Sequence, residues 1–397
     1  TLALGIQNDG FSGIQIGKME TSWVSIMVSQ TFPWAGKRGL RSEVAGMGPR
    51  EAEADLRRVL LSVEAEVERA YLDLLLVRDQ LGLLTKLESL WAQSEGLARI
   101  RYESGEASQS DLMRAQLQRN RLRQQRWALE GEAKRRMAVL NRLRGHPLDE
   151  PIATNRTLAD LPDPALADPE QLTKTAEAES PELKKALLAG VQADRRVDLA
   201  KRDRWPDVTV SAGLMPRGGG FVTMWQAGVA VNLPVWSAQK QSRAIAENRA
   251  RGQAVRSGAE AIRQLLRQRV QERLLALRAL VDSNRLYRSG LLIQSDATVS
   301  STLAQYQVGR VTFASVLEAL AGYLSDMNGF FDSVAATQRI AIAEREISLD
   351  PPGGPASGAM GGAAMTGAGA TSVSSSSSNS VVSPPGADSA GASMSRM

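Results

Sequence analysis

The chain contains an internal duplication, and two similar turn segments mark it most clearly. Residues 101–112 read Arg-Tyr-Glu-Ser-Gly-Glu-Ala-Ser-Gln-Ser-Asp-Leu, and residues 305–317 read Gln-Tyr-Gln-Val-Gly-Arg-Val-Thr-Phe-Ala-Ser-Val-Leu. The shared landmarks are Tyr102 and Gly105 in the first segment, and Tyr306 and Gly309 in the second. Each segment interrupts a helical pattern with a glycine suited to the positive φ of a helix end, and a Ser or Thr follows that can cap the next helix. The sequence therefore predicts two helix–turn–helix segments, tip 1 and tip 2.

The duplication extends well beyond the tips. Residues 30–37 resemble residues 231–240, with Pro33 aligned to Pro234. The repeat unit of roughly 200 residues is far longer than the roughly 20–50 residues of solenoid repeats. A helical pattern over 181–204 precedes the strands of the second copy, whereas nothing precedes those of the first. We therefore expect that the chain begins inside a longer protein, without its first helix and any targeting signal.

Each copy also contains two alternating apolar and polar segments that predict a β-hairpin. These segments are 2–7 and 24–29 in the first copy, and 207–214 and 225–233 in the second. The predicted strands are about 9–11 residues long, which is the length of a tilted membrane-spanning strand. Five of the seven tryptophans lie at the strand ends: Trp23, Trp34, Trp205, Trp225 and Trp236. Such positions are typical of the aromatic girdles of membrane barrels. The alternative is a soluble sandwich in which these rings fill the corners of the core.

Long helical patterns follow each hairpin. Residues 37–103 and 240–306 carry apolar residues at alternating spacings of three and four, which predicts a coiled-coil seam. Pro49 follows two glycines, so we expect regular helix to begin near it. At ~1.5 Å per residue, each helix is on the order of 100 Å long. Shorter helices return from the tips, and the segment 181–204 continues in the return direction after an irregular belt.

Composition excludes several classes of function. The chain has no Cys and one His among its 397 residues, so thiolate and His-rich metal sites are excluded. It has no nucleophile elbow and no acid–base histidine motif, and Thr31 stands where a P-loop ending at Lys37 would need glycine. The net charge of +5 would be compatible with nucleic-acid binding, but acidic and basic residues interleave along the helices. This pattern favours solvated helix faces. We expect no enzyme activity, no cofactor and no metal site. The Gly/Ala/Ser-rich end of the chain is predicted to be disordered, with incidental methionines.

Each copy thus contains a strand hairpin, a long helix, a glycine-containing tip and a shorter helix. Two such copies in succession resemble the TolC family of outer-membrane efflux proteins over roughly residues 1–347. The motifs that carry the resemblance are Tyr102 to Gly105, Tyr306 to Gly309, Leu112, Leu317 and the strand end Gln30-Thr-Phe-Pro33. The stretch 32–37, Phe-Pro-Trp-Ala-Gly-Lys, is most similar to the branch that serves heavy-metal pumps of the RND type.

The resemblance implies a mainly α fold with a transmembrane β portion. Three protomers would form a twelve-stranded β-barrel continued by a coiled-coil α-barrel in the periplasm. The implied segments are a first barrel hairpin (1–36), a first helical hairpin (37–143), an equatorial belt (144–180), a further α-barrel helix (181–204), a second barrel hairpin (205–236), a second helical hairpin (237–347) and a disordered tail (348–397).

The resemblance also assigns roles to residues. The positions implied to dock a periplasmic adaptor are Tyr102, Gly105, Ser108, Asp111, Leu112, Tyr306, Val308, Gly309, Arg310, Thr312 and Leu317. Ser315 and Glu318 occupy the places where relatives carry the acidic residues of a closed pore mouth. Three copies of Glu318 would attract cations, and the alternative is a solvated helix carboxylate.

The implied function is passive export of drugs or metal ions. A homotrimer in the outer membrane of a Gram-negative bacterium would receive them from an inner-membrane pump through a periplasmic adaptor. Two alternatives stay open: an outer-membrane conduit for type I protein secretion, and a soluble coiled-coil scaffold.

Overall fold

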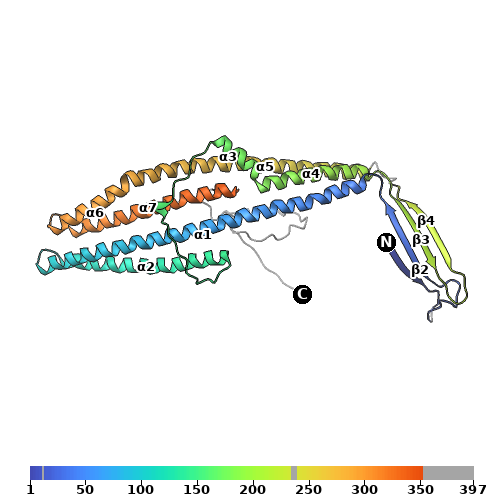
Figure 1. Ribbon diagram of the computed structural model, residues 1–397, viewed down its shortest axis with the longest axis horizontal. Helices are drawn as coiled ribbons and strands as arrows, with labels where there is room; N and C mark the ends of the chain where they lie inside the picture. The colour runs from blue at the N-terminus through green and yellow to red at the C-terminus, as the bar shows by residue number, and fades with distance from the viewer. Residues whose placement is uncertain (11–12, 234–238, 352–397) are drawn as a thin grey trace, which may run out of the picture. The chain divides into compact units, whose positions relative to one another are not determined.

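The computed structural model describes residues 1–10, 13–233 and 239–351 (Figure 1). The predicted girdle residue Trp236 and most of the predicted disordered tail lie outside these ranges. The elements of the first copy are β1 (Leu2–Gln7), β2 (Trp23–Phe32), α1 (Lys37–Glu103) and α2 (Gln109–Arg144). Those that follow are a 3-10 turn (Leu158–Asp160), α3 (Pro169–Glu179), α4 (Pro181–Arg202), β3 (Val208–Met215), β4 (Met224–Val231), α5 (Lys240–Leu286), the π-helix η2 (Tyr287–Leu291), α6 (Leu292–Gln307) and α7 (Phe313–Glu346).

The four strands form one antiparallel sheet in the order β1-β2-β3-β4, so the two hairpins of the duplication pair through β2 and β3. The strands are shorter than predicted: only β2, with 10 residues, reaches the expected length, whereas β1 has 6 and β3 and β4 have 8 each. The outer edges of β1 and β4 have no strand partner among the described residues.

The register of the sheet separates its two faces by chemistry. Leu4 pairs with Ile26, Ile26 with Leu214, and Leu214 with Trp225, so a row of apolar side chains crosses all four strands. This face also carries Leu2, Ile6, Val24, Val28, Phe32, Val208, Val210, Ala212, Ala227, Val229 and Val231, with Gln30 as its one polar member in the paired strands. The opposite face carries mainly small and polar residues: Ala3, Gly5, Gln7, Trp23, Ser25, Met27, Ser29, Thr31, Thr209, Ser211, Gly213, Met215, Met224, Gln226, Gly228 and Ala230. The apolar face is exposed in the single chain, with Leu4 at 72% and Val229 at 70%.

The junction between sheet and helices is held by Lys37, the first residue of α1. Its side chain is buried, and its Nζ donates to the carbonyl oxygen of Trp205 at 2.7 Å and to Asp207 Oδ1 at 2.8 Å. Asp207 also accepts from the backbone N of Trp34 at 3.0 Å, and the rings of Trp34 and Trp205 stack at 5.2 Å. The end of β2 is therefore joined to the start of β3 where the chain leaves the sheet.

Helix α1 contains 67 residues and begins at Lys37, so the prediction that regular helix starts near Pro49 is wrong. The tertiary contacts of α4 hold the weak first turns in place. Arg195 pairs with Glu43 at 2.9 Å, and Gln192 donates to the carbonyl oxygen of Val44 at 3.2 Å. Packing against a neighbouring helix therefore overrides the low helix propensity of this segment.

The second long helix is interrupted by η2, whereas the sequence predicted one continuous helix over 240–306. The ring of Tyr287, at the start of η2, lies 5.9 Å from the ring of Phe330 on α7. A Cβ on the neighbouring Gly329 would approach the Tyr287 hydroxyl to 2.6 Å. The extra residue of a π-turn allows this ring to lie against a glycine of the facing helix.

The predicted irregular belt contains two regular pieces, the 3-10 turn and α3. Asp79 on α1 accepts from the backbone N of Leu158 at 2.6 Å. Asp163 pairs with Arg288 at 2.7 Å and accepts from Asn284 at 3.1 Å. The belt is thus bonded to both long helices.

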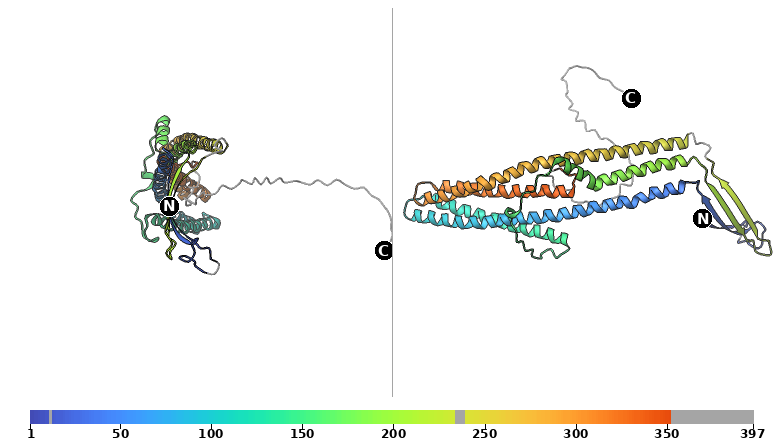
Figure 2. Two further views of the ribbon diagram at one scale, coloured as in Figure 1. Left: turned by 90° about the vertical axis from the view of Figure 1, so that its right-hand side faces the viewer. Right: turned by 45° about the horizontal axis from the view of Figure 1, so that its top comes forward.

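The helices pack as predicted, with each long helix antiparallel to two shorter ones. Helix α1 contacts α2 and α4, and α5 with α6 contacts α4 and α7. Figures 1 and 2 show α1 and α7 between α2 on one side and α6 on the other. The predicted seam of α1 is only partly buried: Leu74 is 0% exposed, whereas Leu60 and Val63 are 47% and 44% exposed. None of the described helices combines the length and the hydropathy needed to cross a membrane.

Candidate functional site: the two helical tips

Tip 1 ends α1 with a glycine-containing Schellman motif. Gly105 has φ +79°, and its N–H donates to the carbonyl oxygen of Tyr102 at 3.0 Å. The N–H of Glu106 donates to the carbonyl oxygen of Arg101 at 2.8 Å, which completes the motif. Ser108 then caps α2, because its Oγ accepts from the backbone N of Asp111 at 3.3 Å.

Tip 2 repeats this backbone geometry. Gly309 has φ +74°, and its N–H donates to the carbonyl oxygen of Tyr306 at 3.1 Å. The backbone N–H of Arg310 donates to the carbonyl oxygen of Gln305 at 2.9 Å. Thr312 is the N-cap residue of α7 but makes no side-chain cap hydrogen bond. The duplication therefore preserves the turn itself more closely than the capping side chain.

One side chain joins the two tips within the chain. The Nη1 of Arg101 donates to the carbonyl oxygen of Tyr306 at 2.7 Å, and its guanidinium carbon lies 5.1 Å from the centroid of the Tyr306 ring. The guanidinium also lies beside Gly309, where a Cβ would be 3.0 Å from Nη2. Arg101 thus couples a charged hydrogen bond to a cation–π contact at the end of α6.

The two tip tyrosines have opposite environments. Tyr102 is 42% exposed, whereas Tyr306 is 2% exposed and packs on Phe313 at 5.5 Å between ring centroids. Burial raises the pKa of the Tyr306 hydroxyl, and that hydroxyl has no hydrogen-bond partner among the described residues. Trp91 of α1 packs edge-on against the same Phe313, so the base of tip 2 is an aromatic core.

The strand-end tryptophans occupy both ends of the sheet but not one face. Trp34 and Trp205 stack at the end nearer the helices, and Trp225 lies at the other end on the apolar face, 76% exposed. The register places Trp23 opposite Gln7, on the small and polar face. Trp23 therefore departs from the predicted girdle position, because strand alternation directs it away from Trp225.

Comparison with known proteins agrees with this arrangement of sheet, helices and tips. The sequence profile described as outer membrane efflux protein matches residues 1–146 and 172–347. The chain belongs to the outer membrane efflux protein family. The matched ranges include both hairpins and both tips and omit part of the belt. No curated protein sequence matches the chain significantly.

Solved outer-membrane channels share the fold at low sequence identity. CusC aligns with a TM-score of 0.72 and 18% identity, covering 88% of this chain and 82% of CusC. The open state of MtrE from Neisseria gonorrhoeae aligns with a TM-score of 0.69 and 17% identity, covering 88% and 80%. VceC from Vibrio cholerae aligns with a TM-score of 0.69 and 14% identity, covering 88% and 85%.

The residues predicted to dock an adaptor separate into three groups by exposure. The exposed group is Tyr102, Gly105, Ser108, Val308, Gly309, Arg310 and Thr312. Asp111, Leu112 and Leu317 are half-buried, and Leu317 packs against the main core. Tyr306 is buried within the chain at 2% exposure, so its side chain supports the tip and contributes little to its surface.

The predicted pore-mouth residues lie on the first turns of α7. Ser315 is half-buried, and its Oγ lies 3.4 Å from the hydroxyl of Thr312. Glu318 is exposed and forms no ion pair with any described residue. The described residues contain no group of three or more side chains that could hold a metal ion within one chain.

Sequence reasoning missed Arg101 because its counterpart in tip 2 is Gln305. The Gln305 side chain is exposed and, within the described part of the chain, donates only to Ser301 of its own helix, at 3.2 Å.

We predict that Arg101→Met loosens tip 2 selectively. Loss of a hydrogen bond from a charged group, worth about 1.5–3 kcal/mol, should accelerate amide hydrogen exchange of Gly309 and Arg310 by roughly ten-fold or more. The matched control is Arg99→Met, since Arg99 is 57% exposed and, among the residues that the structure describes, pairs only with Glu95 of its own helix. Equal exchange at tip 2 in the two variants would contradict the coupling.

Proposed function

We propose that the chain is one subunit of a trimeric outer-membrane channel that passively exports small molecules, drugs or metal ions. The observation that carries the proposal is the four-stranded sheet with one exposed apolar face and two unpaired edges. A sheet of this kind suits a membrane-spanning β-barrel. Its apolar side chains would face lipid, and closure of the sheet would give every backbone N–H and C=O group a hydrogen-bond partner. Three copies of four strands make a twelve-stranded closed barrel.

The opposite face of the sheet suits a water-filled lumen. Its hydroxyl groups bond to one another across strands: Thr31 to Thr209 at 2.9 Å and Thr1 to Ser29 at 2.5 Å. Its glycines and alanines leave room for solutes in the barrel interior. In this assembly Trp225 lies at a membrane interface, and the stacked Trp34 and Trp205 lie at the other interface.

Among the described residues, the helical part also has two edges with exposed apolar side chains. Helix α2 exposes Met113, Leu117 and Trp127, at 49%, 51% and 70%. On the other side, α5 and α6 expose Leu275, Leu286 and Ile293, at 59%, 58% and 62%. Neighbouring protomers would bury these residues by packing α2 against α5 and α6, which continues the barrel into the periplasm.

We assign the tips to a periplasmic adaptor and the source of energy to an inner-membrane pump. The exposed tip residues Tyr102, Ser108, Val308, Arg310 and Thr312 form the docking surface, with Asp111, Leu112 and Leu317 beneath it. The resemblance of residues 32–37 to the heavy-metal branch favours an RND pump. In the closed state, Ser315 and Glu318 of three protomers surround the axis.

The trimer is tested first by cross-linking, because the chain has no cysteine of its own. Leu4→Cys on β1 combined with Val229→Cys on β4 places thiols on the apolar face of the two edge strands. Within one chain, β2 and β3 separate these edges by about 14 Å, so an internal disulfide cannot form. We expect a short bismaleimide to link detergent-extracted protein into trimers.

The matched control pairs Leu4→Cys with Ile26→Cys, which are neighbours within one chain and should give internal links only. Light scattering should give a protein mass of three protomers. A monomer or dimer that needs no detergent would favour a soluble coiled-coil scaffold and contradict the channel.

The second prediction concerns Gly309. A side chain at its φ of +74° costs about 1–2 kcal/mol, and its Cβ would also press on Arg101. We expect Gly309→Val to impair export while leaving the amount of trimer unchanged. Gly105→Val has the same backbone strain, but no atom lies within 4 Å of its Cβ position, so its effect should be smaller.

Export is measured as drug or metal resistance at matched expression of the two glycine variants. Full resistance in the Gly309 variant would exclude tip 2 as a control point for export.

The third prediction concerns the charge of the pore mouth. Three Glu318 carboxylates near one axis should attract divalent cations, so millimolar Mg²⁺ should block single-channel conductance in planar bilayers. Glu318→Gln should remove most of this block. Asp332→Asn, an exposed change farther along α7, should leave it intact. Equal block in the two variants would make Glu318 an ordinary solvated carboxylate.

A further inference from the structure

The end of the sheet nearer the helices carries a cluster of exposed basic side chains. They come from the first turns of α1 (37–43), from the end of α4 and the start of β3 (198–207), and from the first turn of α5 (240–243). Helix α4 contacts both α1 and α5, so the three segments meet where the helices join the sheet (Figure 1). Together they contain eight Lys or Arg and four Asp or Glu. Six exposed cations of this set form what we name the basic collar: Arg38, Arg41, Arg202, Arg204, Lys240 and Arg243.

The four carboxylates in these segments already have basic partners outside the collar. Their N to O distances are Asp207–Lys37 2.8 Å, Asp203–Lys37 3.6 Å, Glu43–Arg195 2.9 Å and Asp198–Lys201 2.9 Å. Arg41 also attracts Asp207, but from beyond ion-pair distance. Among the described residues, no collar cation forms an ion pair. The collar therefore presents six positive charges without a paired carboxylate.

Neighbouring copies of the chain would not supply the missing carboxylates. In a trimer with threefold symmetry, each copy contributes the same segments at the same level. The next carboxylates along α4 and α5 are Asp194 and Glu247, which pair with Arg256 and Arg251 at 2.7 Å each. Three copies would therefore bring three collars to one level. The counter-charges must then come from outside the protein.

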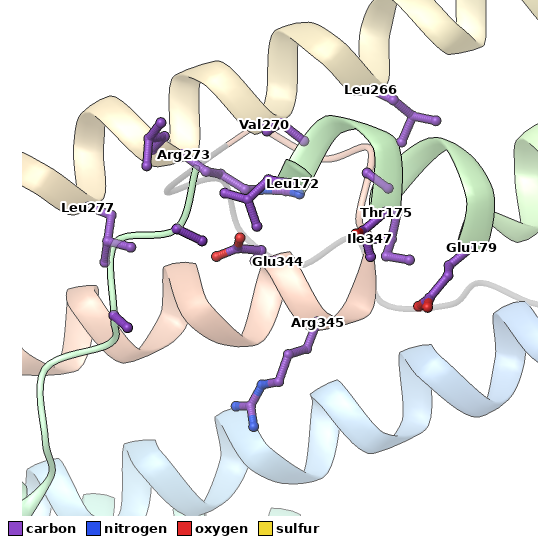
Figure 3. Close-up of a pocket in the computed structure, with 14 residues that line it drawn as sticks. Leu172, Thr175, Glu179, Leu266, Val270, Arg273, Leu277, Glu344, Arg345 and Ile347 are labelled. Carbon is purple, nitrogen blue, oxygen red and sulfur yellow. The ribbon is translucent and has the colours of Figure 1, made fainter. Parts of the chain in front are cut away.

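A cation inside the helical part is compensated differently. Arg273 lines a cavity between α3, α5 and the end of α7, and Figure 3 shows Glu344 on the facing wall. Glu346, Glu344 and Asp350 all attract this guanidinium, and its Nη2 donates to the carbonyl oxygen of Asp350 at 3.2 Å. The chain thus neutralises Arg273 with its own groups. The collar lacks this arrangement, because each carboxylate at its level is bound to another cation.

The opposite end of the sheet has no such excess of charge. The connections between the strands of each hairpin, residues 8–22 and 216–223, carry two basic and two acidic side chains. Arg217 pairs with Glu20 across the two connections at 3.2 Å. Unpaired positive charge is therefore a property of one end of the sheet and not of the sheet as a whole.

The collar adjoins a surface suited to lipid. The rings of Trp34 and Trp205 stack beside it and are 39% and 52% exposed. Phe32 and Val231, at the same end of the apolar face, are 56% and 47% exposed. Exposed tryptophans of this kind lie at the level of lipid headgroups. Arg204 directly precedes Trp205, and one further helical turn adds only about 5.4 Å, so the collar lies at the level of lipid phosphates.

We propose that the basic collar binds the phosphate groups of anionic phospholipids in the membrane leaflet that faces the helices. The proposal rests on the channel function proposed above. Five of the six cations are arginines, whose planar guanidinium groups match phosphate oxygens with paired hydrogen bonds. Long basic side chains can also extend along apolar surface to reach a headgroup. The collar would fix the height of the barrel in the bilayer at the end where force from the helices arrives.

The test is native mass spectrometry of the full chain in a nonionic detergent. The micelles contain equal amounts of phosphatidylglycerol, which is anionic, and phosphatidylcholine, which is zwitterionic, with the same acyl chains. A single cation near an anionic surface strengthens binding by roughly five-fold. At low salt we expect the trimer to retain phosphatidylglycerol over phosphatidylcholine by roughly ten-fold or more. The preference should fall as salt is added, because ions screen exposed charges.

A variant with one change in each segment tests the collar directly. Arg38→Gln, Arg204→Gln and Arg243→Gln together should lower the preference for phosphatidylglycerol by roughly five-fold or more. These side chains are exposed and form no ion pair with any described residue, so their loss should leave the fold intact.

The matched control removes three charges far from the sheet, by Arg135→Gln, Lys174→Gln and Arg285→Gln. These side chains are 77%, 81% and 74% exposed, and each pairs with a carboxylate of its own helix. The control should keep the lipid preference of the unmodified protein. Equal lipid preferences in the two triple variants would overturn the proposal.

The same spectra count the subunits, so the channel and the collar can fail separately. A trimer of the unmodified protein that retains both lipids equally would overturn the collar alone, and this measurement needs no variant. A chain that forms no trimer would contradict the channel, and the collar with it. Displacement of the lipid by inorganic phosphate, but not by sodium chloride of equal ionic strength, would indicate a site for small anions and overturn the proposal. Altered ion selectivity of single channels with unchanged lipid retention in the collar variant would place these cations in the pore, which also overturns it.

Discussion

The unpaired outer edges of β1 and β4 are the constraint from which the proposed assembly follows. In water the apolar face of the sheet is unfavourable, with Leu4, Trp225 and Val229 at least 70% exposed. In lipid that face is satisfied, but each open edge leaves backbone N–H and C=O groups unbonded, at a cost of several kcal/mol per group. Only edge pairing between copies satisfies both demands. Folding of the sheet and association of subunits are therefore one process in this proposal. The exposed apolar residues of α2, α5 and α6 would likewise be buried only by a neighbouring copy.

The duplication gives both tips the same backbone but not the same connections. Each tip closes with a Schellman motif on a glycine of positive φ, so the turn geometry is set locally. The contact between tips is set by one side chain, Arg101, whose counterpart Gln305 does not reach across. As a result Tyr306 is buried under Arg101, and Tyr102 is exposed on the outer surface. The two tips thus share a turn geometry, and the Arg101 side chain makes tip 2 dependent on tip 1.

The features that could be predicted from the sequence are those that residue spacing and turn-forming residues determine locally. The heptad spacing, the strand alternation and the Gly-containing tips predicted the long helices, their ends at the tips and the presence of four strands, whereas the start of α1 and the lengths of three strands differ from the prediction. The sequence did not predict features that depend on contacts between distant segments. The start of α1 is stabilised by α4, and at η2 the Tyr287 ring lies against Gly329 of another helix. At the candidate site, the glycine turns could be predicted from the motif, whereas the adaptor-docking role of the exposed tip positions stays a prediction. The burial of Tyr306 and the role of Arg101 could not be predicted, because both arise from the packing of α1 against α6 and α7.

The position of η2 relative to the belt has a mechanical consequence. Immediately before it, Asn284 bonds to Asp163 of the belt and to Thr337 of α7, and Arg288 within it pairs with the same Asp163. The long helix is thus fixed where the π-turn begins. A π-turn has looser hydrogen bonding than an α-helix and is a usual place for a helix to bend. Movement of tip 2 in the proposed channel would therefore be absorbed at Tyr287–Leu291 and end at the belt. The sheet and the junction at Lys37 would stay in place, because α5 before this point is packed along α4.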